Sequence, residues 1–175
     1  MKPAFSVLFL TATLAAILTG CGRSNDSAAA APAAAATVAA SATVDRPTTG
    51  RAIAITANDT MKFDITEIHA RPGEALAVTL TNTGTTPKFS MGHNWVLVRP
   101  DTDLNAFAAD AAMAAGTDYI PDSFKDKVIA HTKLLGPKES DTALFYAPKT
   151  PGKYPFFCAF PGHMQVGMKG YLIVE

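Results

Sequence analysis

The chain has 175 residues, with 15 lysines and arginines against 15 aspartates and glutamates, and two cysteines. This length allows one domain, or one domain with a tail. Removing the first 20 residues takes away one lysine and no acid, which leaves 14 basic against 15 acidic residues. A balance so close to neutral argues against nucleic acid as a partner, because nucleic-acid-binding domains carry a basic stripe.

The first 20 residues read as an export signal. Lys2 supplies a positive start, and residues 4–17 form an apolar stretch too short to span a bilayer comfortably. The sequence Leu-Thr-Gly-Cys at 18–21 is similar to a bacterial lipobox, in which a peptidase cleaves before the cysteine and the cysteine sulfur carries a diacylglycerol. We therefore expect residues 1–20 to be a lipoprotein signal peptide and Cys21 to be lipidated. An ordinary signal peptide with an unrelated cysteine, or an uncleaved anchor, are the alternatives.

Residues 21–50 read as a lipidated cysteine followed by a flexible linker. Alanine dominates, serine and threonine are interspersed, and no aromatic residue is present to seed a core. As a flexible coil this stretch would span roughly 30 Å. It would hold a periplasmic domain close to its membrane. We favour the outer membrane, because Gly22 stands where inner-membrane lipoproteins carry an aspartate.

The folded domain is expected at residues 51–175, as an all-β, antiparallel Greek-key sandwich. Short segments alternate apolar and polar residues and are separated by Pro, Gly, Asn or Asp. Residues 71–74 (Arg-Pro-Gly-Glu) are a good turn, and residues 103–115 are expected to form one short helix capped by Thr102 or Asp103. About seven strands in this length are typical of a sandwich. The expected strands are 52–57, 65–70, 75–82, 94–98, 142–146, 152–157 and 170–174.

Three potential metal ligands lie on one segment near the C-terminus, spaced Cys158-x4-His163-x4-Met168, and His93 lies far upstream just before an expected strand. Two imidazoles and a thiolate form a trigonal set, which a long axial thioether completes as a blue-copper site. Thiolate and thioether are soft ligands that suit Cu(I), and imidazole suits both oxidation states. Such a site rearranges little when one electron moves.

Each of these residues also has an ordinary explanation. Cys158 could be a buried or disulfide-bonded residue, although a lipidated Cys21 could not be its partner. Met168 could be a core residue, and His93 a buried or capping histidine. It is their combination in this order and spacing that predicts a metal centre.

Several segments closely resemble azurins. They are MGHNWVL at 91–97, VIAHTKLLG at 128–136, FFCAFPGH at 156–163, MKG at 168–170 and NDTMKF at 58–63. The resemblance covers nearly all of residues 51–175. It implies the cupredoxin fold, one type 1 copper per chain and electron transfer between Cu(II) and Cu(I), without enzymatic activity.

The resemblance also implies roles for individual residues. His93 and His163 would bind copper through ring nitrogens, Cys158 through its thiolate and Met168 as a weak axial ligand, and the Gly92 carbonyl would approach from the opposite side. The backbone amides of Asn94 and Phe160 would donate to the cysteine sulfur. Met91 and Met164 would belong to an apolar docking patch, with an exposed His163 ring edge as the exit for the electron.

The sequence departs from azurins at three places. Azurins have three residues between the last histidine and the methionine, whereas this chain has four, as in auracyanin. The N-terminal disulfide of azurins is absent, because no cysteine lies between Cys21 and Cys158. Asn82 aligns with a buried, titrating histidine of many azurins, so we expect no titration there. We expect His131 to be a surface imidazole and His69 an ordinary strand residue.

Redox proteins such as c-type cytochromes or a terminal reductase or oxidase are the expected partners of a monomeric carrier. A periplasmic copper-delivery lipoprotein is the alternative, although the exposed Met- and His-rich tracts of trafficking sites are missing. A copper nitrite reductase would need a second domain and a three-histidine centre, and a dinuclear site would need a second cysteine on the loop. A papain-like Cys-His nucleophile lacks its local signature.

Overall fold

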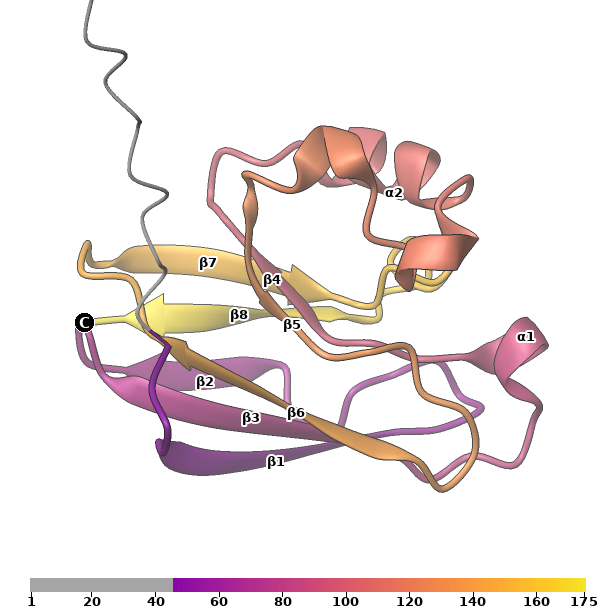
Figure 1. The fold of residues 1–175 in the computed structure, drawn as a ribbon, viewed down its shortest axis with the longest axis horizontal. Helices are drawn as coiled ribbons and strands as arrows, with labels where there is room; N and C mark the ends of the chain where they lie inside the picture. Colours follow the sequence, from indigo (N-terminus) through magenta and orange to yellow (C-terminus); the bar gives the residue numbers. More distant parts are fainter. Residues whose placement is uncertain (1–45) are drawn as a thin grey trace, which may run out of the picture. The chain divides into compact units, whose positions relative to one another are not determined.

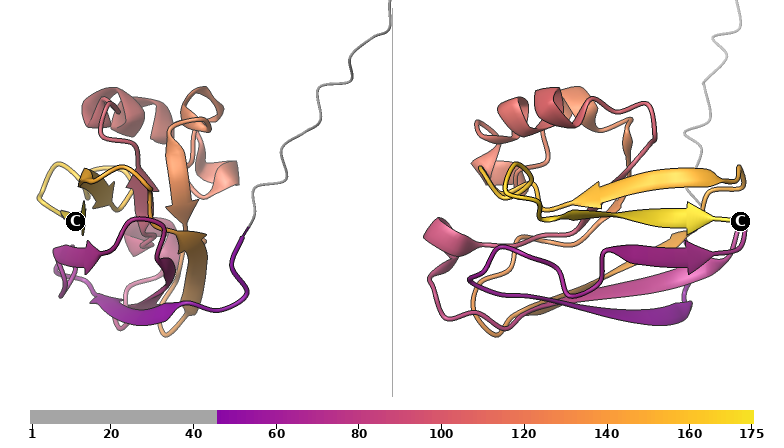
Figure 2. Two further views of the ribbon diagram at one scale, coloured as in Figure 1. Left: turned by 90° about the vertical axis from the view of Figure 1, so that its left-hand side faces the viewer. Right: turned by 180° about the vertical axis from the view of Figure 1, so that it is seen from behind.

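The computed structural model describes residues 46–175, so the predictions for the signal peptide, Cys21 and most of the linker lie outside the described residues. The described chain forms two sheets that face each other (Figures 1 and 2). The smaller sheet has the strand order β1-β3-β6, with β1 at Arg51–Ala57, β3 at Ala75–Asn82 and β6 at Ser140–Tyr146. The larger has the order β2-β8-β7-β4-β5, with these strands at Glu67–Ala70, Lys169–Val174, Gly152–Phe157, Val96–Val98 and Val128–His131.

The sandwich prediction is confirmed, but the expectation of wholly antiparallel pairing is wrong. β1 pairs with β3, and β2 pairs with β8, in parallel. Parallel neighbours require a crossover connection. Here the chain leaves β1, forms β2 in the opposite sheet, and returns to form β3 beside β1. The sequence pattern shows which residues form strands and does not show in which sheet each strand lies.

Strand prediction succeeded where burial alternates. In β3 every second residue is buried, including Leu76, Val78 and Leu80, and the predicted bounds 75–82 match those of the strand. β5 was not predicted as a strand. Its first three residues are all partly buried and His131 is exposed, so no alternation with period two marks it.

The predicted helix is shorter than expected, and a second one was missed. α2 spans Leu104–Ala111, and the Asp103 carboxylate caps it by accepting hydrogen bonds from the amides of Asn105 and Ala106. The remainder of the predicted segment includes a 3-10 turn at Ala115–Thr117, and a further 3-10 turn lies at Asp122–Phe124. α1 is a single turn at Lys88–Met91.

Two hydrophobic clusters hold the described chain together. The larger lies between the sheets and includes Trp95, Phe156 and, from the C-terminal segment, Cys158 and Met168. The smaller packs α2 against the larger sheet and contains Phe107, Phe157 and Met164, among others. No helix within residues 46–175 is long and apolar enough to cross a membrane.

Candidate metal centre

His93 is held in place by its backbone. It lies between α1 and β4, and it exchanges two hydrogen bonds with Leu135, whose carbonyl accepts from the His93 amide at 3.1 Å and whose amide donates to the His93 carbonyl at 2.8 Å. Its imidazole is fully buried. This pairing fixes the backbone of His93, and its ring faces the sulfur of Cys158 on the loop that follows β7.

The loop after β7 is closed by its own backbone. The Cys158 amide donates to the Met168 carbonyl at 3.0 Å, and the Met168 amide donates to the His163 carbonyl at 3.0 Å. Gly162 and Gly167 have φ angles of 86° and 95°, which favour glycine, and so let the loop turn within a few residues. The ends of the Cys-x4-His-x4-Met segment therefore lie side by side.

Three donor atoms converge in the interior. The Cys158 sulfur lies 3.4 Å from Nδ1 of His163 and 4.0 Å from Nδ1 of His93. All three donor atoms lie within 4.8 Å of one another, and all three residues are buried. Metal–nitrogen and metal–sulfur bonds of about 2.0–2.3 Å, arranged trigonally, would separate such donors by about 3.5–4 Å. The three side chains therefore fit a single metal ion.

The imidazoles are suited to binding metal at neutral pH. Burial, assisted by the neighbouring His93, lowers the pKa of His163 to about 4. Burial also lowers the pKa of His93. Both rings are therefore neutral near pH 7 and carry a free lone pair.

The thiol behaves in the opposite way. Burial raises the pKa of Cys158 to about 12, and the backbone amides of Asn94 and Phe160 oppose this rise by donating to the sulfur. Without metal the thiol keeps its proton at neutral pH, so metal binding must release that proton. The contribution of the Asn94 and Phe160 amides matches the prediction from the azurin resemblance.

The Asn94 side chain is a functional element that the sequence reading missed. Its Oδ1 accepts a hydrogen bond from the Ala159 amide at 2.8 Å, and its Nδ2 donates to the Asp118 carbonyl at 2.7 Å. Asn94 is fully buried. It thereby ties the His93 segment to the cysteine loop and to the turn at Asp118. Its place directly after His93, a predicted copper ligand, was the only signal in the sequence.

Met168 and Gly92 lie in suitable surroundings, and their assignment as ligands stays a prediction. Met168 is fully buried in the same cluster as Cys158. Gly92 is also buried, and a Cβ atom there would lie 2.7 Å from the Lys88 carbonyl oxygen and 3.0 Å from the Leu134 side chain. Only glycine therefore fits beside His93 without a shift of the backbone.

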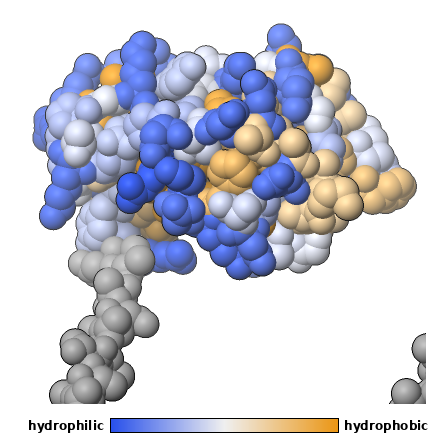
Figure 3. Space-filling view, turned by 90° about the horizontal axis from the view of Figure 1, so that it is seen from above, coloured by the Kyte–Doolittle hydropathy of each residue, from blue (hydrophilic) through white to orange (hydrophobic). Residues whose placement is uncertain are grey.

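The predicted docking patch needs correction. Met91 is half-buried, but Met164 lies in the smaller hydrophobic cluster at 3% exposure, so its proposed surface role is wrong. Exposed apolar residues near this end include Phe89 on α1 and Val166 on the loop. Apolar side chains gather toward this end in Figure 3. A loop residue pointing inward cannot be distinguished from one pointing outward by composition.

His163 is also less exposed than expected. Its residue exposure is 3%, so little of the ring edge reaches solvent. The Phe160 ring packs on it with centroids 4.6 Å apart, and Tyr119 packs on Phe160 at 5.1 Å. Aromatic side chains therefore cover one side of the predicted exit.

The other polar predictions agree with the structure. His131 is exposed at the end of β5, and His69 is an exposed residue of β2 that contacts Glu67 and Glu175. Asn82 is buried, donates to the Leu135 carbonyl at 3.2 Å and accepts from the Gly84 amide at 2.9 Å. An amide that cannot titrate thus occupies that position.

Comparison with known proteins decides the family. Residues 51–175 match the model of the plastocyanin/azurin family of copper-binding proteins. The chain belongs to this family. The match confirms the resemblance to azurins and copper as the cofactor.

Comparisons with individual proteins agree with this family assignment. Outer membrane protein H.8 of Neisseria gonorrhoeae is 41% identical over 115 residues, which are 64% of this chain and 61% of that protein. The azurin of Pseudomonas fluorescens biotype C is 40% identical over 128 residues, 70% of this chain and 97% of the azurin. Reduced auracyanin from Roseiflexus castenholzii superposes with a TM-score of 0.61 and 36% identity, over 71% of this chain and 96% of auracyanin. The cupredoxin fold is thereby confirmed, while the match spans less than two thirds of the H.8 protein.

Proposed function

We propose that this cupredoxin is a single-electron carrier, with one copper held by His93, Cys158 and His163 and with Met168 and the Gly92 carbonyl as weak axial partners. The observation that carries the proposal is the convergence of two neutral imidazole nitrogens and one thiol sulfur in the interior of the protein. When bound there, copper supplies a one-electron couple between Cu(II) and Cu(I). Nothing in this role requires a substrate to be bound or cleaved.

The protein contributes metal-donor atoms that are buried from water and held in fixed positions. The His93–Leu135 backbone pairing and the closed Cys158–Met168 loop fix the donor atoms, and Asn94 links the two segments. The Asn94 and Phe160 amides stabilise negative charge on the sulfur. A site held in this way rearranges little on gain or loss of an electron, which favours fast transfer.

The test is a redox titration of the copper-loaded protein. One equivalent of reductant per chain should bleach the blue colour, and an oxidised c-type cytochrome should restore it while copper stays with the protein through gel filtration. The alternative function, copper delivery, predicts the reverse. Ready transfer of copper to a chelating acceptor, with no electron exchange, would exclude the carrier role.

We further propose that the chain is a lipoprotein with the organisation signal peptide 1–20, lipidated Cys21 and linker to residue 50, and cupredoxin domain 51–175. The Leu-Thr-Gly-Cys sequence supports the lipidation, and the name of the H.8 relative, an outer membrane protein, supports the outer membrane. On this proposal the domain works in the periplasm as a monomer. The tether would raise its effective concentration near membrane-bound redox partners such as cytochromes or a terminal reductase or oxidase.

The two cysteines offer a matched pair of variants for this second proposal. Cys21→Ser should move the protein from the membrane fraction to the soluble fraction and abolish incorporation of labelled palmitate. Cys158→Ser should leave both unchanged. Retention of Cys21→Ser in the membrane would contradict lipidation and favour an uncleaved anchor.

A further inference from the structure

Two successive residues after the 3-10 turn at Ala115–Thr117 have left-handed backbone conformations. Asp118 and Tyr119 have φ angles of 55° and 61°. Residues other than glycine rarely adopt this region, because the Cβ atom crowds a carbonyl oxygen, and a bulky residue such as tyrosine is an outlier there. Such strain persists only where surrounding contacts hold it, and it is concentrated at functional sites.

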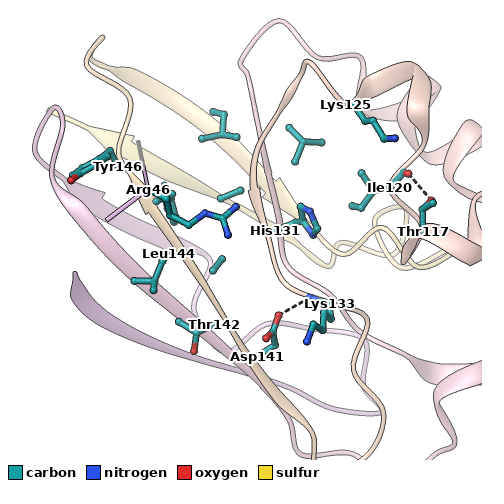
Figure 4. Close-up of a pocket in the computed structure, with 15 residues that line it drawn as sticks. Arg46, Thr117, Ile120, Lys125, His131, Lys133, Asp141, Thr142, Leu144 and Tyr146 are labelled. Carbon is teal, nitrogen blue, oxygen red and sulfur yellow. Dashed lines mark hydrogen bonds between the residues drawn. The ribbon is translucent and has the colours of Figure 1, made fainter. Parts of the chain in front are cut away.

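Hydrogen bonds on both sides hold this turn. The Ile120 amide donates to the Thr117 carbonyl at 2.9 Å, and the Thr117 hydroxyl donates to the Ile120 carbonyl at 2.7 Å. Figure 4 shows the second of these bonds beside the groove that β5 and β6 line. On the other side, the buried Asn94 side chain donates to the Asp118 carbonyl at 2.7 Å. The backbone of Tyr119 therefore lies between two fixed points.

The side chain of Tyr119 connects the turn to the metal centre. It packs against the smaller hydrophobic cluster, and its ring meets the edge of the Phe160 ring with centroids 5.1 Å apart. The Phe160 ring packs on the His163 imidazole with centroids 4.6 Å apart, and Nδ1 of His163 lies 3.4 Å from the Cys158 sulfur. A row of three rings thus leads from the strained turn to the thiol.

Exposure to solvent falls along this row. Tyr119 and Phe160 are partly exposed, His163 is almost buried and Cys158 is fully buried. Phe160 also packs against the larger hydrophobic cluster, so its contact with Tyr119 joins the two clusters beside the metal centre. Displacement of the Phe160 ring would uncover the His163 imidazole and, behind it, the thiol.

We propose that Tyr119 is a positioning residue of the metal centre. The strained turn holds its ring against Phe160, and Phe160 in turn keeps the His163 imidazole in place and solvent away from Cys158. A backbone relaxed into the right-handed or extended region would direct the tyrosine ring elsewhere, which explains why the strain is retained. The inference rests on the metal centre proposed above, and it concerns a residue that is not itself a ligand.

The reactivity of the Cys158 thiol in the metal-free protein tests the proposal without copper. In the full chain carrying Cys21→Ser, Cys158 is the sole thiol, and its reaction with a chromogenic aromatic disulfide is followed by absorbance. Adding Tyr119→Ala should speed this reaction at least tenfold. Tyr119→Phe keeps the ring and its contact with Phe160, so it should react within twofold of the parent rate.

A control separates lost positioning from lost stability. Tyr154→Ala removes a buried tyrosine of β7 from the larger cluster. Exposure of a thiol by global unfolding increases steeply with urea, whereas exposure by a small local opening depends on urea only weakly. Below the unfolding transition, the reaction rate of Tyr119→Ala should therefore change little with urea, while that of Tyr154→Ala should rise steeply.

A milder variant keeps the test decisive if the alanine variant does not fold. Tyr119→Leu retains apolar volume but removes the ring, and it should react at least threefold faster than the parent. Emission at short wavelength from the buried Trp95 reports whether each variant is folded.

Copper loading distinguishes this inference from the proposed function. Tyr119→Ala retains the four predicted ligands, so it should turn blue with copper but lose the ion to a chelator at least tenfold faster than the native chain. A native chain that bound no copper would contradict the proposed function, and the thiol measurements would still decide the role of Tyr119.

Three results would overturn the inference. These are unchanged thiol reactivity in Tyr119→Ala and Tyr119→Leu, a dependence on urea as steep as that of Tyr154→Ala, or equal rates for Tyr119→Phe and Tyr119→Ala. The second result would make Tyr119 an ordinary packing residue, and the third would show that its ring is not what protects the thiol.

Discussion

The two ends of the sandwich differ in whether their polar groups are buried or exposed. At the end where the loop after β7 lies, two imidazoles, a thiol and the Asn94 amide are buried. At the end where the chain terminates (Figure 1), charged groups are exposed and paired with one another, as in Arg51 with Glu74 and His69 with Glu67 and Glu175. The first arrangement is costly unless every group has a partner, whereas the second contributes little to stability.

This contrast indicates where function lies. Buried donors that face one another are explained by a bound ion, and the closed backbone around them maintains their spacing. Exposed ion pairs are screened by solvent, so removing one member changes the stability of the protein little. Substitutions at the metal end should therefore change metal binding or stability far more than substitutions at the other end.

The largest effect is expected from Cys158→Ser. The serine hydroxyl cannot provide the soft thiolate that gives the intense visible band, so the copper-loaded variant should be colourless by absorption spectroscopy. Trp95, the sole tryptophan, is fully buried among Phe145 and Phe156, so its fluorescence should stay at short wavelength if the sandwich is folded. A folded variant that remained intensely blue would refute the ligand assignment.

Asn94→Ala should give the next largest effect. It removes the hydrogen bonds to the Ala159 amide and the Asp118 carbonyl and leaves a cavity, at a cost of about 3 kcal/mol in the free energy of unfolding. Urea unfolding of the metal-free protein measures this. The matched control is Asn105→Ala, at an exposed position of α2, which should change stability by less than about 0.5 kcal/mol. Equal effects would contradict a bridging role for Asn94.

Gly92→Ala should destabilise the metal-free protein by about 1–3 kcal/mol, because the added Cβ meets the Lys88 carbonyl and the Leu134 side chain. Gly116→Ala is the control, since no atom lies within 4 Å of its added Cβ and its φ is not in the left-handed region. Thermal unfolding compares the two. A Gly92→Ala variant as stable as Gly116→Ala would show that the backbone beside His93 tolerates displacement.

The smallest effect is expected at the opposite end, from His69→Gln. Hydrogen bonds that the His69 ring donates to the carboxylates of Glu175 and Glu67 raise the pKa of His69 above its ordinary 6.5 in the folded state. The folded protein therefore holds this proton more tightly than the unfolded chain, and the resulting stabilisation is complete below pH 6.5 and disappears as pH rises through the raised pKa.

The difference in melting temperature between the native chain and His69→Gln should accordingly be small, present at pH 6 and absent in alkaline solution. His131→Gln, which removes an exposed strand histidine with no carboxylate partner among residues 46–175, is the control. A difference that grew with pH would have the wrong sign for this account.

The same contrast explains how far the sequence could predict the structure. The segment from Cys158 to Met168 is short, so a single loop can bring Cys158 and His163 together. The bounds of β3 could be predicted because its burial alternates. The parallel pairs β1–β3 and β2–β8 depend on which sheet each strand joins, which no local pattern encodes.

The burial of Met164 and the Asn94 bridge depend on packing between distant segments. Met164 contributes to the cluster beneath α2, and Asn94 contacts the turn at Asp118 and the loop at Ala159. Residue type alone does not predict these contacts. Methionine, for example, is common both in cores and on binding surfaces. Only the folded chain distinguishes these possibilities.

The most direct test of the metal centre is a crystal structure of the copper-loaded protein with anomalous diffraction recorded at the copper edge. We predict one strong peak per chain, about 2.0–2.3 Å from the Cys158 sulfur and from Nδ1 of both His93 and His163. A peak elsewhere, or one bound by fewer than two of these three atoms, would contradict the assignment of this buried cluster as the copper site.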